Sequence, residues 1–378
     1  MKSLFYQVPL FLRGWHKRVS GGLTICMTLG PLVSGFSATE RIITFDAPGA
    51  GTATFQGTLA VMVSDSGETI GPFVNANNVY HGFIRSADGE FRIIDAPGAG
   101  RGYLQGTQPN GVASDGKVVG YFYDANYVYH GFLREPSGRI ITINAPNAGT
   151  GANQGTNATS INVDGEIAGY IEDSNNVYHG FVRSRSGTFT LFDVPNAGTG
   201  KGQGTVVLYG GALNAQGEIC GFYFDPTGAV LCYLRVASGL ITTFDPLNSI
   251  LCFPGWINQA GVTIGSALAD GTYHSFICSS NGAITTFDAP YGELGAAGTQ
   301  ANAISASGVI TGFFGDSNLI THGFVRSVDG VISKFDAPGA GIVPGSYQGT
   351  TPLSINSKGE IVGYLVDSNQ VTHGFLRK

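Results

Sequence analysis

The chain has 378 residues, of which 58 are glycine, 43% are hydrophobic, 11% are aromatic and only 12% are charged. The hydrophobic fraction excludes an intrinsically disordered chain, and abundant glycine with aromatic residues is typical of many short strands joined by tight turns. A formal net charge of -6 without a basic patch argues against nucleic acid or an anionic membrane surface as a partner.

Residues 1–37 differ from the rest of the chain. Four basic residues precede an uncharged stretch that begins at Gly21, and the small residues Gly35 and Ser37 stand where a signal peptidase reads its substrate. We therefore predict a signal peptide over residues 1–37, cleaved after Ser37, and a secreted mature chain in the extracellular space or the periplasm. An uncleaved membrane anchor is the competing interpretation, but the apolar stretch contains several glycines and is barely long enough to span a membrane.

Short sequence markers recur through residues 38–378. The tripeptide His-Gly-Phe, or a variant of it, fills a slot that repeats seven times at intervals of about 49 residues, and in the fourth repeat Leu231 takes the place of the histidine. A second marker, an apolar residue followed by Asp-Ala-Pro or a close variant, also occurs seven times, and Gln-Gly-Thr marks most units. Repeats of this length are typical of propellers and other repeat architectures. The histidines of the repeated slot are His81, His130, His179, His274, His322 and His373.

Each repeat reads as four short strands separated by turn residues. In the third repeat we predict strands at 156–162, 166–171, 177–183 and 188–193, bounded by Gly, Asp, Asn and Pro. Four antiparallel strands per repeat are typical of one propeller blade. The sequence therefore predicts an all-β fold in which residues 38–378 form a single seven-bladed β-propeller of four-stranded blades.

The two ends of the mature chain predict how the ring closes. The mature chain opens with a fourth-strand segment at 41–46 and stops after a third-strand segment at 373–378. The N-terminal strand can therefore join the C-terminal blade, which leaves no open strand edge between the first and last blades.

These repeats resemble the HAF family of extracellular repeats, which is named for a His-Ala-Phe tripeptide. In this chain the middle residue is usually glycine, and the likeness covers residues 38–378, including the Thr-Phe-Asp-Ala-Pro strand after the tripeptide. The resemblance implies an exported repeat domain and assigns no biochemical activity, and a fold analogy would not assign one either.

The repeated polar residues favour structural roles. Six equivalent histidines do not form the singular set that a catalytic centre needs, so we predict that each ties the third strand to its neighbours within one sheet. The turn before each tripeptide carries Asp or Asn. Such residues can bind calcium, but they are also ordinary turn residues, and we favour the turn role. We expect no metal and no cofactor. The turn residues are Asn75, Asp124, Asp173, Asp225, Asp270, Asp316 and Asp367.

The repeat symmetry breaks in the fourth and fifth units. The fourth carries an insertion around 207–211, and the fifth replaces Gln-Gly-Thr with a stretch that contains the only tryptophan after residue 37. We take Tyr209, Phe253 and Trp256 as candidate ligand-binding residues, because the faces of sugars pack on aromatic rings. The alternative is that they fill space between blades.

The four cysteines after residue 37 fall in the same two units. An exported protein favours disulfides, and Cys220 and Cys232 lie on adjacent strands of one hairpin, so we predict a disulfide between them if their register brings the Cα atoms within range. Pairing of Cys252 with Cys278 is less favoured, and buried free thiols are the alternative.

Three functions follow from these observations. The leading hypothesis is a non-catalytic binding module that recognises a carbohydrate or a protein at the cell surface. The second is a polysaccharide lyase or glycoside hydrolase, for which nonrepeated residues would have to converge. The third is a structural protein of an extracellular matrix. Candidates for the second are Arg101, Tyr209, Asp245 and Glu293.

Overall fold

The computed structural model describes residues 41–291 and 294–378, of which residues 42–378 form one compact unit. The predicted signal peptide and its cleavage site lie outside the described residues. The described chain consists of strands, turns and loops, and it contains no helix that is long and apolar enough to span a membrane. The prediction of an all-β chain is confirmed.

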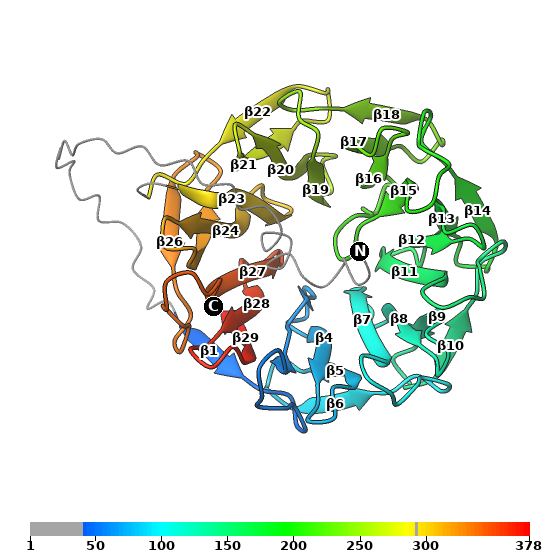
Figure 1. The fold of residues 1–378 in the computed structure, drawn as a ribbon, viewed down its shortest axis with the longest axis horizontal. Helices are drawn as coiled ribbons and strands as arrows, with labels where there is room; N and C mark the ends of the chain where they lie inside the picture. The colour runs from blue at the N-terminus through cyan, green and yellow to red at the C-terminus, as the bar shows by residue number, and fades with distance from the viewer. Residues whose placement is uncertain (1–40, 292–293) are drawn as a thin grey trace. The chain divides into compact units, whose positions relative to one another are not determined.

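Most strands form successive groups of four antiparallel neighbours, as Figure 1 shows. Each group begins with an inner strand and ends with an outer one of four residues. The second repeat contains β7 (Gly106–Val112), β8 (Val118–Tyr123), β9 (Tyr129–Arg134) and β10 (Ile140–Ile143). The third contains β11 (Gly155–Ile161), β12 (Ile167–Glu172), β13 (Tyr178–Arg183) and β14 (Phe189–Phe192). The sixth contains β23 (Leu294–Ile304), β24 (Ile310–Asp316), β25 (Thr321–Arg326) and β26 (Ile332–Phe335).

The groups with irregular first strands lie where the sequence departs from its repeat. One is β15 (Gly204–Val207), β16 (Ile219–Phe224), β17 (Val230–Arg235) and β18 (Ile241–Phe244), and the next is β19 (Cys252–Ile257), β20 (Thr263–Ala269), β21 (Thr272–Cys278) and β22 (Ile284–Phe287). In the first repeat the inner strand is split into β2 (Gly57–Thr58) and β3 (Met62–Val63), followed by β4 (Thr69–Val74), β5 (Tyr80–Arg85) and β6 (Phe91–Ile94).

The ends of the described chain pair with each other. Strands β27 (Gly349–Ile355), β28 (Ile361–Val366) and β29 (Thr372–Arg377) follow one another, and β1 (Ile42–Phe45) lies antiparallel to β29. The register places Ile42 opposite Arg377 and Phe45 opposite Gly374. The first strand of the chain thus stands where the other groups have their fourth strand.

Single parallel residue pairs link one group to the next. Tyr129 of β9 pairs with Gly155 of β11, and equivalent pairs occur at other junctions, so that 25 strands count as one mixed sheet. Strands β19 to β22 form a separate four-stranded sheet, whose backbone pairing with β17 is limited to the isolated bridge between Val230 and Leu251. The other parallel pairs are Tyr80 with Gly106, Tyr178 with Gly204, Thr321 with Gly349 and Thr372 with Gly57.

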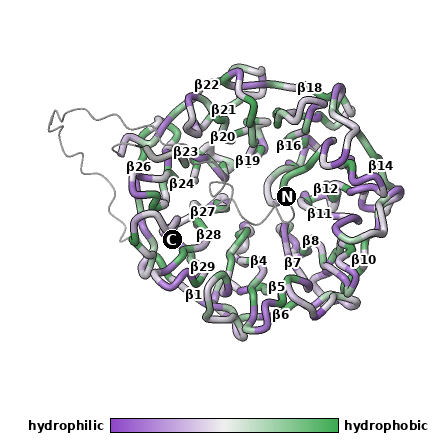
Figure 2. The backbone as a smooth tube through the Cα atoms, in the orientation of Figure 1, coloured by the Kyte–Doolittle hydropathy of each residue, from purple (hydrophilic) through white to green (hydrophobic). Residues whose placement is uncertain are grey.

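The core lies between neighbouring groups. Figure 2 shows hydrophobic stretches along the strands and hydrophilic ones in the connections between them. The phenylalanine of the repeated tripeptide is fully buried in six groups, and burial of each such ring is worth roughly 1.5–3 kcal/mol. An arginine at the end of the third strand stacks over a phenylalanine of the preceding group, as Arg235 does over Phe192 at 4.9 Å and Arg85 over Phe45 at 4.8 Å.

Candidate functional site

Long loops and short turns gather at one end of the strands, which we call the loop face. The turns join second to third strands, and the loops lead from the fourth strand of one group to the first of the next. Backbone hydrogen bonds hold each loop to the neighbouring turn, as from Leu104 N–H to Asn78 O and from Asn153 N–H to Tyr127 O. Loops on a rigid scaffold are common places for binding sites.

The Gln-Gly-Thr marker fixes these loops. Gly106 has a φ of 114°, and a Cβ there would overlap the carbonyl oxygen of Tyr80, so only glycine fits. Thr107 Oγ1 accepts a hydrogen bond from Ala96 N–H at 2.9 Å, and Gln105 Oε1 accepts one from Gly102 N–H at 2.8 Å. The marker therefore serves the scaffold rather than a ligand.

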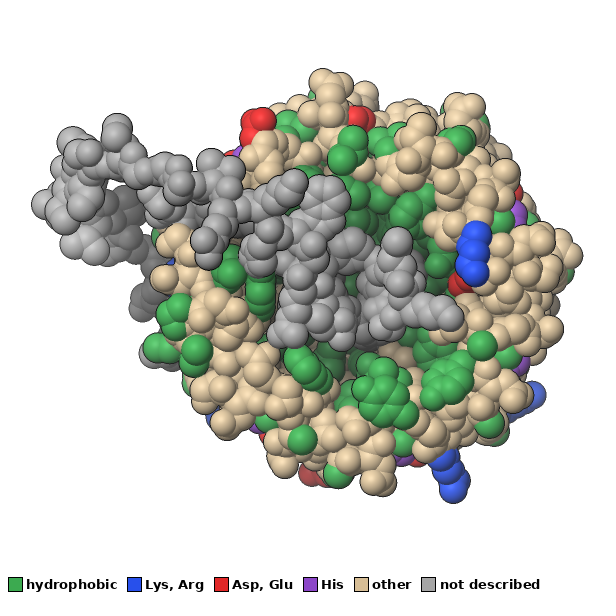
Figure 3. Space-filling view, viewed as in Figure 1, with side chains coloured by type: hydrophobic (Ala, Val, Ile, Leu, Met, Phe, Trp, Pro, Cys, Tyr) green, Lys and Arg blue, Asp and Glu red, His purple; other side chains and the backbone are tan. Residues whose placement is uncertain are grey.

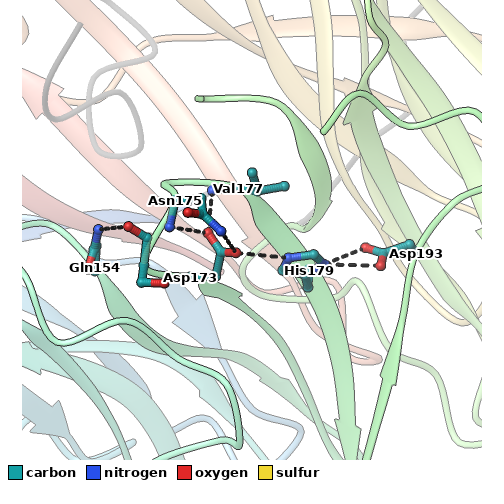
Figure 4. A network of polar contacts seen from close by, with 7 residues as sticks. Gln154, Asp173, Asn175, Val177, His179 and Asp193 are labelled. Carbon is teal, nitrogen blue, oxygen red and sulfur yellow. Dashed lines mark hydrogen bonds and ion pairs between the residues drawn. The ribbon is translucent and has the colours of Figure 1, made fainter. Parts of the chain in front are cut away.

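The repeated histidines lie in polar networks within single groups, as Figure 4 shows for His179. Its Nδ1 lies 2.9 Å from Asp193, which directly follows the fourth strand, and its Nε2 lies 3.7 Å from the turn residue Asp173. Asp173 Oδ1 also accepts the backbone N–H groups of Asn175 and Val177, both at 2.8 Å. These are the side-chain contacts of an ordinary aspartate turn.

Charge and hydrogen bonding reinforce this network. The hydrogen bond to Asp193 raises the pKa of His179 against the opposing effect of burial, and the charges of Asp193 and Asp173 add to it. Burial opposes ionisation of Asp173, yet backbone N–H donors lower its pKa overall. The same contact recurs between His81 and Asp95, His130 and Asn144, His274 and Asp288, His322 and Asp336, and His373 and Asp46.

Exposed aromatic side chains stand on the loop face of the first two repeats. Tyr103 is 64% exposed, Phe55 is 55% exposed and Tyr127 is 36% exposed, and we call these three the aromatic arc. Figure 3 shows hydrophobic side chains on this face over β4 to β8. The hydroxyl of Tyr127 donates a hydrogen bond to the backbone carbonyl oxygen of Tyr103 at 2.8 Å, which ties the side chain of Tyr127 to the loop that carries Tyr103.

Two members of the aromatic arc have a strained backbone. Phe55 has a φ of 66° and Tyr127 a φ of 61°, in the left-handed region that costs an aromatic residue on the order of 1 kcal/mol or more. The slot of Phe55 has a positive φ in the other repeats that carry the Gln-Gly-Thr marker, where it is filled by Leu104, Asn153, Gly202 and Tyr347. The positive φ therefore belongs to the repeated loop, and Asn and Gly are the residues that tolerate it best.

A second polar and aromatic cluster lies deeper, between β9 and β12. The hydroxyl of Tyr129 donates to Glu172 Oε2 at 2.6 Å, and Asn157 Nδ2 donates to the hydroxyl of Tyr170 at 3.0 Å. Burial raises the pKa of Glu172, although the Tyr129 hydrogen bond and the charge of Lys201 act in the opposite direction. Burial also raises the pKa of Tyr129 well above its usual value.

An aromatic run connects this cluster to the fifth repeat. Tyr178 lies 6.2 Å from Phe224 between ring centroids, Phe224 lies 5.5 Å from Phe222, and Phe222 lies 5.5 Å from Phe253. The predicted residue Phe253 thus ends a run of rings that begins beside Glu172. Repeat counting missed Glu172 and Tyr129 because their contact forms only between neighbouring groups.

The predicted trio does not form one exposed platform. Trp256 is half-buried against the backbone of Gly210 and Gly211, where an added Cβ would meet its ring, and it packs into two core clusters. Tyr209 precedes these glycines, and burial raises its pKa to about 12. Trp256 therefore fills space between groups.

The residues considered for catalysis lie in different surroundings. Asp245 Oδ1 accepts the N–H of Ser249 at 2.8 Å in a tight turn, and Arg101 is exposed on the loop before β7. Glu293 lies outside the described residues. Within the described chain no group of three or more His, Cys, Asp or Glu side chains is placed to hold a metal ion.

The predicted disulfide between Cys220 and Cys232 is wrong. The register pairs Cys220 with Leu234 and Cys232 with Phe222, so the two cysteines are diagonal neighbours, whose Cα atoms lie about 7–8 Å apart, beyond the usual range for a disulfide. Cys232 is instead bonded to Cys252 of β19, with 5.5 Å between Cα atoms. Cys220 and Cys278 are free and buried.

A cleft of about 570 Å³ opens at the opposite end of the strands, between the third and fourth repeats. Its charged lining includes Glu166 and Arg235. Glu166 accepts a hydrogen bond from Asn162 at 2.9 Å, as equivalent glutamates do in other repeats, and Arg235 stacks over Phe192. Both groups thus serve repeated structural contacts, Glu166 within its own unit and Arg235 with the preceding unit.

The comparisons with known proteins address the fold. No family model and no curated protein matches the sequence. Among solved structures, the chain is similar to the BP39L lectin from Burkholderia pseudomallei, with 10% identity over 85% of this chain and 96% of the lectin and a TM-score of 0.52. It is also similar to the uncomplexed acylaminoacyl peptidase from Pyrococcus horikoshii, with 12% identity over 86% of this chain and a TM-score of 0.51.

These likenesses show the fold alone. The chain spans 52% of the length of the peptidase. The all-β architecture is thus of the kind found in β-propeller lectins and in the propeller domains of peptidases.

Proposed function

We propose that this protein is an exported, non-catalytic β-propeller of seven four-stranded blades that binds carbohydrate through its loop face. Seven repeats in the sequence and the pairing of β1 with β29 support a closed ring. The repeated tripeptide supports membership of the HAF family, and the N-terminal pattern of basic, apolar and small residues supports export with cleavage after Ser37.

The aromatic arc is the observation that carries the proposal. Three aromatic side chains are exposed on the loops and the turn of the first two repeats, where their rings are open to a ligand. Aromatic rings offer an apolar face to the C–H groups of a sugar at little loss of side-chain entropy.

A protein of similar fold supports this assignment. BP39L is a lectin, so a chain of this architecture is compatible with carbohydrate recognition. The repeated histidines and the Gln-Gly-Thr markers act in the scaffold, which leaves the residues that differ between repeats to determine the ligand.

The test is a binding measurement on a panel of cell-wall and exopolysaccharide glycans with residues 38–378. We expect saturable binding that falls about tenfold or more in Tyr103→Ala, because loss of one stacked ring removes on the order of 1.4 kcal/mol. Leu240→Ala is the matched control, since Leu240 is 68% exposed but lies in a turn between third and fourth strands, away from the loop face.

The same panel distinguishes the other functions. New reducing or unsaturated ends would favour a glycoside hydrolase or polysaccharide lyase. Saturable binding that Tyr103→Ala leaves unchanged would refute the assignment to the aromatic arc. A blank panel would refute carbohydrate binding and direct the search to a protein at the cell surface or to assembly as a matrix protein.

A further inference from the structure

Glu172 breaks the pattern of its repeated position. It is the last residue of the second strand in the third repeat, opposite Tyr178 in the register. The same register position elsewhere holds apolar, aromatic or small residues. These are Val74, Tyr123, Phe224, Gly315 and Val366.

A carboxyl group at this position is costly for the fold. Glu172 is only 7% exposed, and the hydroxyl of Tyr129 on the preceding repeat donates a hydrogen bond to it. Burying an ionisable group is unfavourable unless its partners compensate. The next junction makes the equivalent contact with two aromatic rings, Tyr178 and Phe224, at 6.2 Å. Packing between repeats therefore does not need a carboxylate.

The surroundings of Glu172 combine the groups that recognise a sugar. Tyr178 and Phe224 are half-buried, and their rings are inclined by only 31° to each other. Lys201 is exposed on the loop before β15, close enough for its charge to act on Glu172. Three kinds of group therefore lie together at the loop-face ends of β12, β13 and β16. The rings can pack on the apolar face of a sugar, the carboxylate can accept hydrogen bonds from its hydroxyl groups, and the ammonium can donate to its hydroxyl oxygens.

We propose that Glu172, Tyr178 and Phe224 form a subsite that takes one sugar ring, with Glu172 accepting hydrogen bonds from its hydroxyl groups. This proposal rests on the proposed carbohydrate binding and adds a specificity-determining residue to it. A buried group that pairs with a ligand hydroxyl discriminates strongly against ligands that lack the hydroxyl, because it is then left unpaired. The subsite should therefore select the hydroxyl pattern of the ligand.

The competing explanation is a structural tether. Tyr129 belongs to β9 and Glu172 to β12, so their hydrogen bond joins two repeats whatever else it does. Glu172→Gln separates the two roles, since the amide oxygen still accepts from Tyr129 while the charge is lost. A tether predicts only a change in stability, whereas a subsite predicts a change in ligand affinity.

The experiment measures affinity for the best glycan of the panel between pH 4 and pH 8. For wild type we expect affinity to fall on acidification, because protonation of a carboxylate with a raised pKa removes an acceptor. For Glu172→Gln we expect binding at pH 8 weaker by about tenfold, with a flat pH profile. The titratable groups that face Glu172 are Tyr123, Tyr129, Tyr170, Asp173, Tyr178 and Lys201.

Two further variants make the result decisive. Glu166→Gln alters a glutamate at the opposite end of the strands and should leave the affinity and its pH profile unchanged. Phe224→Leu keeps an apolar side chain but removes the ring, and it should weaken binding even if Glu172→Gln does not fold. Wild-type binding that both Glu172→Gln and Phe224→Leu retain would overturn the subsite alone. Absence of wild-type binding to any glycan would overturn the proposed function as well.

Discussion

Removal of the disulfide between Cys232 and Cys252 should destabilise the protein by a predictable amount. The bond closes a loop with a sequence separation of 20 residues. The chain-entropy relation for a loop of that length gives roughly 3 kcal/mol at 25 °C. Backbone pairing contributes little at this junction, because β19 lacks the Gln-Gly-Thr marker and Val230 pairs with Leu251 only as an isolated bridge.

Urea unfolding of residues 38–378 with and without reductant measures this contribution. We expect the double variant Cys232→Ser, Cys252→Ser to lose about 3 kcal/mol and its unfolding to become insensitive to reductant. The control is Cys220→Ala, Cys278→Ala, which should remain sensitive to reductant because its disulfide is intact. Equal unfolding of the wild type with and without reductant, or a peptide map that links Cys220 to Cys232, would refute the reasoning.

Three further perturbations test the scaffold. Gly106→Ala should lower the free energy of unfolding by roughly 3 kcal/mol or more, because the new Cβ would overlap the carbonyl oxygen of Tyr80. The control Gly202→Ala, also at positive φ but with open space around it, should cost only about 1 kcal/mol. Equal losses of stability in thermal unfolding would contradict this. Deletion of 38–45 should destabilise the whole unit because β1 pairs with β29 along Ile42–Phe45, and an unchanged melting curve would argue against that pairing. His179→Leu introduces the residue type that the fourth repeat carries in this slot, Leu231, and it should lose more stability at pH 5.5 than at pH 8.5. The pKa of His179 is raised in the folded protein, so the stability that its charged form contributes is fully present below the pKa of the unfolded chain. That contribution is lost as the pH rises through the pKa of the folded state. Equal losses at both pH values would show that charge plays no part.

The strands were predictable from the sequence because their signals are local. The segments expected in the third repeat, at 156–162, 166–171, 177–183 and 188–193, differ from β11 to β14 by at most one residue at each end. Turn residues and the alternation of side chains fix such boundaries within a few positions. The pairing of β1 with β29 was also predictable, since the chain begins and ends with complementary parts of one repeat.

Contacts between repeats were not predictable in the same way. The partner of Cys232 depends on a two-residue offset in the β16–β17 register and on the approach of β19 from the next group. Trp256 is singular in the sequence and so suggests a ligand platform, but its ring packs against Gly210 and Gly211. A single sequence does not specify such approaches between groups.

The candidate site lies between these two cases. Glu172 was detectable in principle as the one carboxylate in a slot of apolar and aromatic residues, but only the contact with Tyr129 shows that it is buried. The strained backbone of Phe55 and Tyr127 is likewise a property of the folded chain.

A crystal structure of residues 38–378 with the best glycan of the panel would test the central claim most directly. We predict seven four-stranded sheets, with β1 in the same sheet as β29 and the glycan on the loop face, in contact with Tyr103 or Phe224. A glycan bound in the cleft lined by Glu166 and Arg235, or a ring in which β1 does not join β29, would contradict this account.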